Sequence, residues 1–236
     1  MVAVRHHLLL PAAGSGRRMG HEFPKQYLEI AGRTVLQHTL ERLGALERID
    51  SIMLVLSVDD PWWSTVESRL SAPVRAKLRC AAGGAERCDS VFNGLQALKA
   101  VAQPDDFVLV HDSVRPCVRI ADVLRLLEAV AHEPAGGLLA TPVRDTLKLA
   151  TADAHVERTV DRTMLWSAAT PQVFRYRILH EALVKMAAVG RKVTDEAEAV
   201  EALGHPVRLV QGSADNIKLT YADDLQLAEL ILGAND

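Results

Sequence analysis

The chain alternates short apolar runs with segments in which apolar residues recur at helical spacing. Apolar runs of strand length occupy residues 7–10, 51–57, 78–82, 107–111, 138–141 and 207–211. Between them, leucines and valines recur every three or four residues, as at Leu36, Leu40 and Leu43, which predicts amphipathic helices. This alternation is typical of an α/β protein whose mostly parallel sheet carries helices on both faces. Ligands in such folds bind beyond the carboxyl ends of the strands.

The alternation lapses between residues 143 and 165. Two runs that suit strands, 147–149 and 155–160, are separated by the turn-prone residues 150–153, and no helical segment intervenes. This pattern predicts an extended β-hairpin arm over 143–165. A lone hairpin cannot bury both of its faces, so we expect the arm to pack on a second subunit and the chain to form a homodimer. The 236 residues otherwise suit a single domain, residues 1–236.

A loop of small residues follows the first predicted strand, and several cations follow the loop. The loop consists of Ala12, Ala13, Gly14, Ser15 and Gly16, and the cations are Arg17, Arg18 and Lys25. Backbone N–H groups can approach a phosphate closely where side chains are small, and cations can neutralise it. The string is not a P-loop, and its glycine spacing misses the dinucleotide-binding fingerprint by one residue. We therefore predict a triphosphate cradle of another kind.

Composition excludes several classes of partner. The 27 basic and 30 acidic residues leave a net charge of −3, so no overall field attracts nucleic acid or an anionic membrane. The apolar run at the start of the chain is too short to cross a membrane. The three cysteines form no CxxC pair, which suits a reducing compartment. We expect a cytoplasmic protein that binds small molecules.

The loop and the following Pro24-Lys25-Gln26 resemble the signature of the 2-C-methyl-D-erythritol 4-phosphate cytidylyltransferases, a family of nucleotidyltransferases. Later segments match the same family in the same order. They are Gly83-Gly84-Ala85-Glu86-Arg87 with Ser90, Val110-His111-Asp112-Ser113-Val114-Arg115-Pro116, Pro142-Val143-Arg144-Asp145-Thr146-Leu147-Lys148, Asp161-Arg162, Thr170-Pro171-Gln172, Thr194-Asp195-Glu196 and Asn216-Ile217-Lys218-Leu219-Thr220. The resemblance therefore covers nearly the whole chain.

The resemblance implies a fold, a reaction and a metal ion. The fold would be a Rossmann-like nucleotidyltransferase fold with an interlocking arm. The reaction would convert 2-C-methyl-D-erythritol 4-phosphate and CTP to 4-diphosphocytidyl-2-C-methyl-D-erythritol and pyrophosphate, in the non-mevalonate route to isoprenoid precursors. Mg²⁺ would bridge the triphosphate oxygens. A phosphate monoester dianion is already a nucleophile, so catalysis would depend on cations that hold two polyanions together.

Residue roles follow from the same resemblance. Arg18 and Lys25 would stabilise the charge that develops during transfer. CTP would bind Ala12, Ala13, Gly14, Ser15, Gly16, Gly84, Ala85, Arg87, Ser90, Asp112 and Ser113. Methylerythritol phosphate would bind Arg162 and Lys218, with contributions from Thr146, Thr170, Thr194 and Arg115. Asp112 would lie near Mg²⁺.

Several alternatives stay open at this point. Asp112 either ligates Mg²⁺ directly or caps a helix, and Arg162 acts either in its own subunit or in its partner's. Thr194 also suits the N-cap of a helix over 195–203. His111 is expected to be a hydrogen-bonded, partly buried histidine rather than a base. The rival functions are a cytidylyltransferase for ribitol phosphate or another polyol phosphate, and a catalytically silent nucleotide-binding module, against which Arg18 and Lys25 argue.

Overall fold

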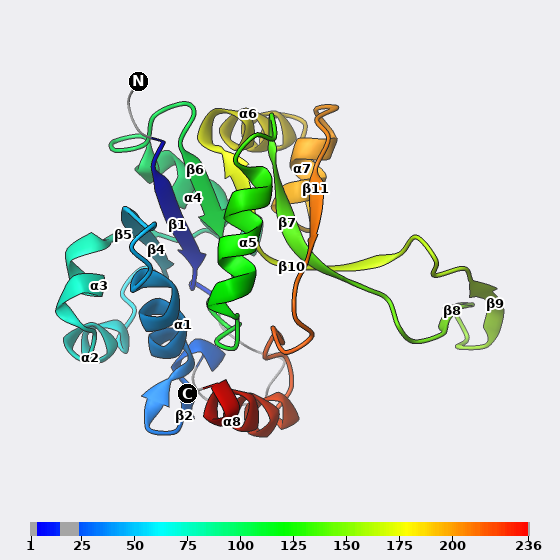
Figure 1. The fold of residues 1–236 in the computed structure, drawn as a ribbon, viewed down its shortest axis with the longest axis horizontal. Coiled ribbons are helices and arrows are strands. Elements are labelled where there is room, and N and C mark those ends of the chain that lie inside the picture. The colour runs from blue at the N-terminus through cyan, green and yellow to red at the C-terminus, as the bar shows by residue number, and fades with distance from the viewer. Residues whose placement is uncertain (1–3, 15–23, 236) are drawn as a thin grey trace.

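A seven-stranded sheet runs through the middle of the molecule (Figure 1). The computed structural model describes residues 4–14 and 24–235. The strands lie in the order β11 (Arg208–Gln211), β7 (Gly136–Pro142), β10 (Trp166–Arg175), β6 (Phe107–Val110), β1 (His6–Pro11), β4 (Ser51–Leu56) and β5 (Leu78–Ala82). Within this sheet β10 is antiparallel to its two neighbours, and the other pairs are parallel. The prediction of a mostly parallel sheet is confirmed.

Helices cover both faces of the sheet, as the strand sequences require. Leu8 and Leu10 of β1 are buried in one core and Leu9 is buried in the other, because successive side chains of a strand point to opposite faces. Each core is completed by helices whose apolar residues belong to it. The first core contains α1 (Val35–Gly44), α3 (Ala72–Lys77) and α5 (Ile120–Val130), and the second contains α4 (Arg87–Leu98), α6 (Tyr176–Ala188) and α7 (Glu196–Glu201).

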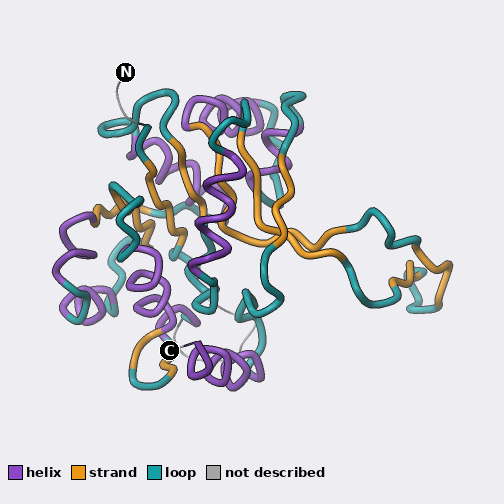
Figure 2. The backbone as a smooth tube through the Cα atoms, viewed as in Figure 1, coloured by secondary structure: helices purple, strands orange, loops and turns teal. Residues whose placement is uncertain are grey.

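The predicted arm leaves the body of the molecule as a long hairpin (Figures 1 and 2). The hairpin extends from the ends of β7 and β10, and the Val143 N–H donates to the Leu165 carbonyl at its base. A separate two-stranded sheet of β8 (Leu147–Ala150) and β9 (Val156–Val160) forms its far end. Most of its side chains are exposed, including Val156 at 63% and Met164 at 84%. The extended hairpin is therefore confirmed.

A third, smaller core lies beyond the carboxyl edge of the sheet. It joins α8 (Asp223–Asn235) to the short pair β2 (Glu29–Ile30) and β3 (Arg33–Thr34) through Leu28, Cys117, Leu219 and Leu232. The remaining short helices are η2 (Lys25–Tyr27) and α2 (Trp63–Ser68). None of the helices in residues 4–14 and 24–235 has both the length and the apolar character that a membrane crossing requires.

Candidate active site

A cavity of about 490 Å³ opens at the carboxyl edge of the sheet, beyond β1, β5 and β6. The loop after β1 and the residues after β6 line it together, as the sequence predicts. Its lining includes Ala12, Ala13, Gly14, Lys25, Gly84, Ala85, Arg87, Ser90, Asp112, Ser113 and Lys218. Four residues predicted for the same site, Ser15, Gly16, Arg17 and Arg18, lie outside the described residues. Every other predicted CTP contact lines this cavity.

The described part of the loop after β1, residues 12–14, is held to the rest of the fold by hydrogen bonds to its backbone. The Gln26 amide Nε2 donates to the carbonyls of Ala12 at 2.6 Å and Gly14 at 3.2 Å. The Ser57 hydroxyl donates to the Ala13 carbonyl, and the Ala12 N–H donates to Val55. Because these bonds need no ligand, the wall of the cavity is formed before a substrate arrives.

The glycine turn after β5 lies against this loop because it lacks side chains. A Cβ on Gly83 would lie 2.3 Å from the Ala13 Cβ, and one on Gly84 would lie 2.3 Å from the Asp89 Cβ. The Ser90 hydroxyl accepts from the Gly84 N–H at 3.1 Å and donates to the Glu86 carbonyl at 3.0 Å. Only glycine fits such approaches, so the turn brings backbone atoms to the cavity wall. Ser90 contributes by holding the turn.

Three cations surround the carboxylate of Asp112, which is 5% exposed. The Arg87 Nε lies 2.9 Å from Oδ1, while the Lys218 Nζ and the Arg115 Nε lie 3.0 Å and 3.2 Å from Oδ2. Burial by itself would raise the pKa of Asp112, but the charges of Arg87, Lys218 and Arg115 outweigh burial and hold the pKa well below its usual range. Asp112 is therefore a permanent anion that keeps three cations at one point.

His111 lies behind Asp112 in a hydrogen-bonded network. The Thr170 hydroxyl accepts from the Asp112 N–H at 3.0 Å and lies 3.0 Å from the His111 Nδ1, to which it donates. Because a carbonyl oxygen can only accept, the His111 Nε2 carries the ring proton and donates to the Arg115 carbonyl at 3.1 Å. Complete burial lowers the pKa of His111 to about 4. The histidine is a neutral part of the framework, as the sequence analysis expects, although it is buried fully rather than partly.

A second cavity of about 190 Å³ adjoins the first. Both cavities share Arg87, Asp112 and Lys218 in their walls. The second cavity adds Arg115, Thr170 and Thr194, three of the residues predicted to bind the acceptor phosphate. The structure thus brings four of the six predicted acceptor-binding residues together beside the predicted CTP pocket.

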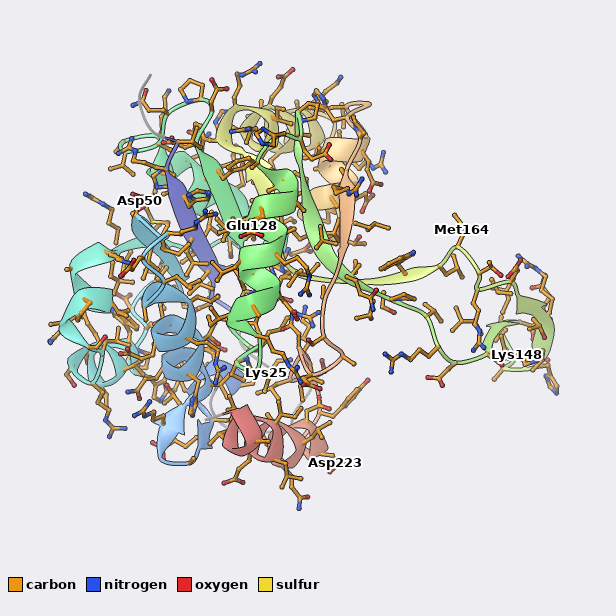
Figure 3. All side chains as sticks on the ribbon, viewed as in Figure 1. Lys25, Asp50, Glu128, Lys148, Met164 and Asp223 are labelled. Carbon is orange, nitrogen blue, oxygen red and sulfur yellow. The ribbon has the colours of Figure 1, made fainter. Side chains whose placement is uncertain are left out.

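The other two predicted acceptor contacts, Thr146 and Arg162, lie on the exposed arm. Neither of them lines the two cavities, and the arm carries them away from the body (Figures 1 and 3). Lys148 and Met164, each two positions after one of them, mark the arm in Figure 3, whereas Lys25 lies in the body of the molecule. Within this chain, Arg162 and Thr146 therefore do not join the other four predicted acceptor contacts.

Thr194 does not cap α7, so that expectation is wrong. The helix begins at Glu196, and the Asp195 side chain accepts from the Glu198 N–H as its N-cap. The Thr194 N–H and hydroxyl instead donate to the Glu198 carboxylate at 2.7 Å and 3.0 Å. A carboxylate accepts a backbone N–H more strongly than a hydroxyl does, which favours Asp195 as the cap.

Sequence reasoning assigned no roles to four buried polar residues that hold the site. They are Gln26, Gln172, Glu196 and Asn216. Gln172 binds the first turn of α7. The Asn216 Nδ2 donates to the Thr170 carbonyl at 2.7 Å, and the backbone carbonyl of Asn216 accepts from Arg115. Each belongs to one of the ordered motifs and lies within two positions of a predicted site residue. Proximity to a functional residue was the one signal available for them.

Comparison with known proteins agrees with this geometry. Residues 6–234 match the family model described as 2-C-methyl-D-erythritol 4-phosphate cytidylyltransferase. The chain belongs to this family. A protein of that name from Dechloromonas aromatica is 49% identical over 231 residues, which cover 98% of each chain. The resemblance drawn from the ordered motifs is therefore confirmed.

Solved structures confirm the fold. A crystal structure of a 4-diphosphocytidyl-2C-methyl-D-erythritol synthase superposes with a TM-score of 0.84 at 36% identity, covering 98% of this chain and 100% of that one. A 2-C-methyl-D-erythritol 4-phosphate cytidylyltransferase from Thermus thermophilus has a TM-score of 0.77 at 33% identity, with 97% and 98% covered. The expected nucleotidyltransferase-like α/β fold is thus established over nearly the whole chain.

Proposed function

We propose that the two adjoining cavities bind CTP and 2-C-methyl-D-erythritol 4-phosphate and that the chain transfers the cytidylyl group between them. Its membership of the cytidylyltransferase family gives the reaction class. The observation that carries the assignment of the site is the wall that the two cavities share, where Asp112 holds Lys218 at the point at which two polyanions would meet. The products are 4-diphosphocytidyl-2-C-methyl-D-erythritol and pyrophosphate, in isoprenoid precursor synthesis.

The reaction needs positioning rather than a general base. An oxygen of the acceptor phosphate attacks the α-phosphorus of CTP, and the bond from that phosphorus to the oxygen of the leaving pyrophosphate breaks in line. The attacking phosphate is close to a dianion at neutral pH and therefore has no proton to lose. The neutral, fully buried His111 is consistent with this, since its ring nitrogens are both engaged in the framework.

Lys25 and Arg18 supply the charge that stabilises the transition state. Lys25 lines the larger cavity, and its Nζ also donates to the Leu219 carbonyl at 3.1 Å, which ties it to the segment that carries Lys218. Arg18, outside the described residues, is assigned from its place in the loop. Lys218 and Arg115 supply positive charge for the acceptor phosphate in the smaller cavity, and Thr170 and Thr194 complete the wall of that cavity.

The residues present fit a magnesium ion that is held mainly by phosphate. Among the described residues no group of three His, Cys, Asp or Glu side chains could cage a metal ion, and Asp112 is the one carboxylate shared by the two cavities. Mg²⁺ commonly binds through one or two carboxylates and the phosphates of its substrate. Bound there, Mg²⁺ would neutralise part of the triphosphate charge, and Asp112 would be its protein neighbour.

The chain acts as a homodimer of single nucleotidyltransferase domains, residues 1–236, with the arm 143–165 as the dimerisation element. The support is an arm whose apolar side chains are left uncovered, together with a hollow of about 550 Å³ at its base lined in part by Val143, Leu165 and Trp166. A partner that covers this surface would bring Arg162 and Thr146 of each arm to the cavity of the other subunit.

We place the enzyme in the cytoplasm. Cys80, Cys88 and Cys117 are all free thiols, which suits a reducing compartment. The balanced charge of the chain supports small-molecule substrates over nucleic acid or a membrane surface.

One assay tests the reaction and its nearest rival. Pyrophosphate release is measured with CTP or UTP as donor and with methylerythritol phosphate or ribitol phosphate as acceptor, with and without a chelator. We expect the fastest turnover with CTP and methylerythritol phosphate, and almost none when divalent metal is removed. Faster turnover with ribitol phosphate would establish the rival polyol activity, and full turnover without metal would refute the magnesium assignment.

A further inference from the structure

Arg87 connects two carboxylates that come from distant parts of the chain. Its Nε donates to Asp112 Oδ1 at 2.9 Å, and its Nη1 and Nη2 donate to Glu196 Oε1 at 2.7 Å and Oε2 at 3.1 Å. Asp112 follows β6, Arg87 begins α4 and Glu196 begins α7. The guanidinium therefore ties together three elements that surround the two cavities.

These bonds use the donor faces that a phosphate would need. A guanidinium holds a phosphate best through a fork of two parallel N–H groups. Glu196 occupies the fork between Nη1 and Nη2, and Asp112 occupies Nε, which belongs to the other fork. Arg87 lines both cavities and its side chain is 29% exposed, yet it offers neither fork to a ligand in this arrangement.

Glu196 is itself held firmly in place. Its side chain is 2% exposed, so its charge is compensated by Arg87 and not by water. The first turn of α7 is fixed to β10, because Gln172 donates to the Asp195 carboxylate at 2.9 Å and accepts from the Ala197 N–H at 2.9 Å. The carboxylate that engages Arg87 is thus anchored to the central sheet.

We propose that Glu196 is a positioning residue for cytidylyl transfer, which holds Arg87 on Asp112 and keeps that guanidinium away from the triphosphate of CTP. This inference rests on the proposed function of the larger cavity. Asp112 then stays at the junction of the two cavities, where it fixes Lys218 and Arg115. A freed Arg87 would bind the triphosphate already in the ground state, and such binding does not lower the barrier to transfer.

The substitution Glu196→Gln separates this role from a merely structural one. The amide keeps the size of the side chain but removes its charge, so Arg87 is no longer held by an ion pair on that side. We expect calorimetry to show CTP affinity unchanged or up to about tenfold tighter, while kcat falls about tenfold or more, as is common when a supporting residue is lost. A residue that only stabilises the fold would weaken CTP binding and turnover together.

The charge-balanced double variant Arg87→Met/Glu196→Gln tests whether Arg87 mediates the effect. If it does, kcat stays near that of Glu196→Gln, while any gain in CTP affinity disappears because the freed cation is gone. Glu196→Asp keeps the charge but shortens the side chain by one methylene, and should give an intermediate loss of kcat with an unchanged melting temperature. Glu201→Gln, at the exposed end of α7, is the matched control and should behave as wild type.

Three results would overturn the inference. The first is a kcat of Glu196→Gln within twofold of wild type, and the second is a weaker affinity of Glu196→Gln for CTP. The third applies if Glu196→Gln binds CTP more tightly than wild type: it is an equally tight affinity in the double variant, which lacks Arg87. Failure of the proposed function would be recognised separately. In that case wild type and Glu201→Gln, too, would form no 4-diphosphocytidyl-2-C-methyl-D-erythritol from CTP and methylerythritol phosphate.

Discussion

Two regions of the molecule place their side chains in opposite environments. One is the junction where the two cavities meet, and the other is the arm. At the junction, Asp112 is 5% exposed and has a charged partner on both of its oxygens. On the arm, Met164 is 84% exposed and Val156 is 63% exposed. At the junction a buried carboxylate is compensated by charged partners, whereas on the arm these apolar side chains are exposed to water. Burial of polar groups and exposure of apolar groups both cost free energy unless a partner compensates for them.

The difference shows where each region finds its partners. The junction finds them within the chain, in a network that runs from Glu196 through Arg87 and Asp112 to Lys218. Such a network fixes its charges before substrate binds, which is the condition for electrostatic catalysis. On the arm, several apolar side chains, Val156 and Met164 among them, lack cover within the described chain, so we assign their cover to a second subunit. Each prediction below disturbs one of the two regions.

The largest expected effect is a loss of turnover when Lys25, in the wall of the larger cavity, is removed. Lys25→Ala should lower kcat by about 10²–10³-fold with little change in the KM for CTP, because the lysine is needed most when charge develops on the pyrophosphate. Steady-state kinetics at saturating acceptor measure this. Lys99→Ala, which removes an exposed lysine just after α4, is the control and should leave kcat unchanged. A raised KM with an unchanged kcat would show that Lys25 serves ground-state binding instead.

Much of the junction could be predicted because its chemistry is carried by short motifs at the ends of strong strands. The apolar runs before Ala12 and before His111 predict parallel strands, and parallel strands bring their carboxyl ends to one edge. The residues that follow these two strands are therefore expected to lie close together at that edge of the sheet. The sequence could not indicate that Arg87 would face two carboxylates, since Glu196 lies 109 positions away and no local pattern relates them.

The strand β10 was the main element that the sequence pattern did not indicate. It contains Pro171, which lacks an N–H, and its pairing with β7 shifts between Ala168 and Gln172. After Trp166, its first half consists of small residues, Ser-Ala-Ala-Thr, without an alternation of apolar and polar side chains. Yet β10 supplies Thr170 and Gln172 to the site, so the irregularity that concealed the strand is also what places these residues. The arm was predicted correctly because it breaks the α/β alternation around it.

The second prediction joins the two regions across subunits. Lys25→Ala and Arg162→Ala homodimers should both be nearly inactive, and their mixture should regain about a quarter of wild-type activity after subunit exchange. In a mixed dimer, one site inherits both lesions and the other inherits neither, if Arg162 acts on its partner's cavity. Pyrophosphate release before and after exchange measures the gain. No gain after proven exchange would place Arg162 in its own subunit's site.

The third prediction addresses the arm alone. Met164→Asp should weaken the dimer about tenfold or more, because a charge would then be buried against the partner. Light scattering over a dilution series measures the dissociation constant. Val189→Asp changes another exposed apolar residue, 68% exposed just after α6, and should leave the dimer intact. Equal dimer stability in the two variants would remove the arm from the interface.

The smallest expected effect is the dependence of stability on pH. The pKa of His111 is lowered from 6.5 to about 4 by burial, so between these values the unfolded chain binds a proton that the folded chain does not. The free energy of unfolding should therefore fall as pH drops through this window, and His111 should account for about 2 kcal/mol of loss between pH 7 and pH 5.

His111→Gln tests this because glutamine does not titrate. Urea unfolding at the two pH values should show a smaller loss of stability in this variant than in wild type, even if its stability at pH 7 is lower. His155→Gln, which removes an imidazole that is 80% exposed on the arm, is the control and should retain the wild-type slope. Contributions of other groups, including the half-buried His6, are common to all three proteins and cancel in the comparison. Equal slopes for His111→Gln and His155→Gln would mean that burial does not keep His111 neutral in the folded chain, and the contrast between the buried junction and the exposed arm would not extend to the protonation of this histidine.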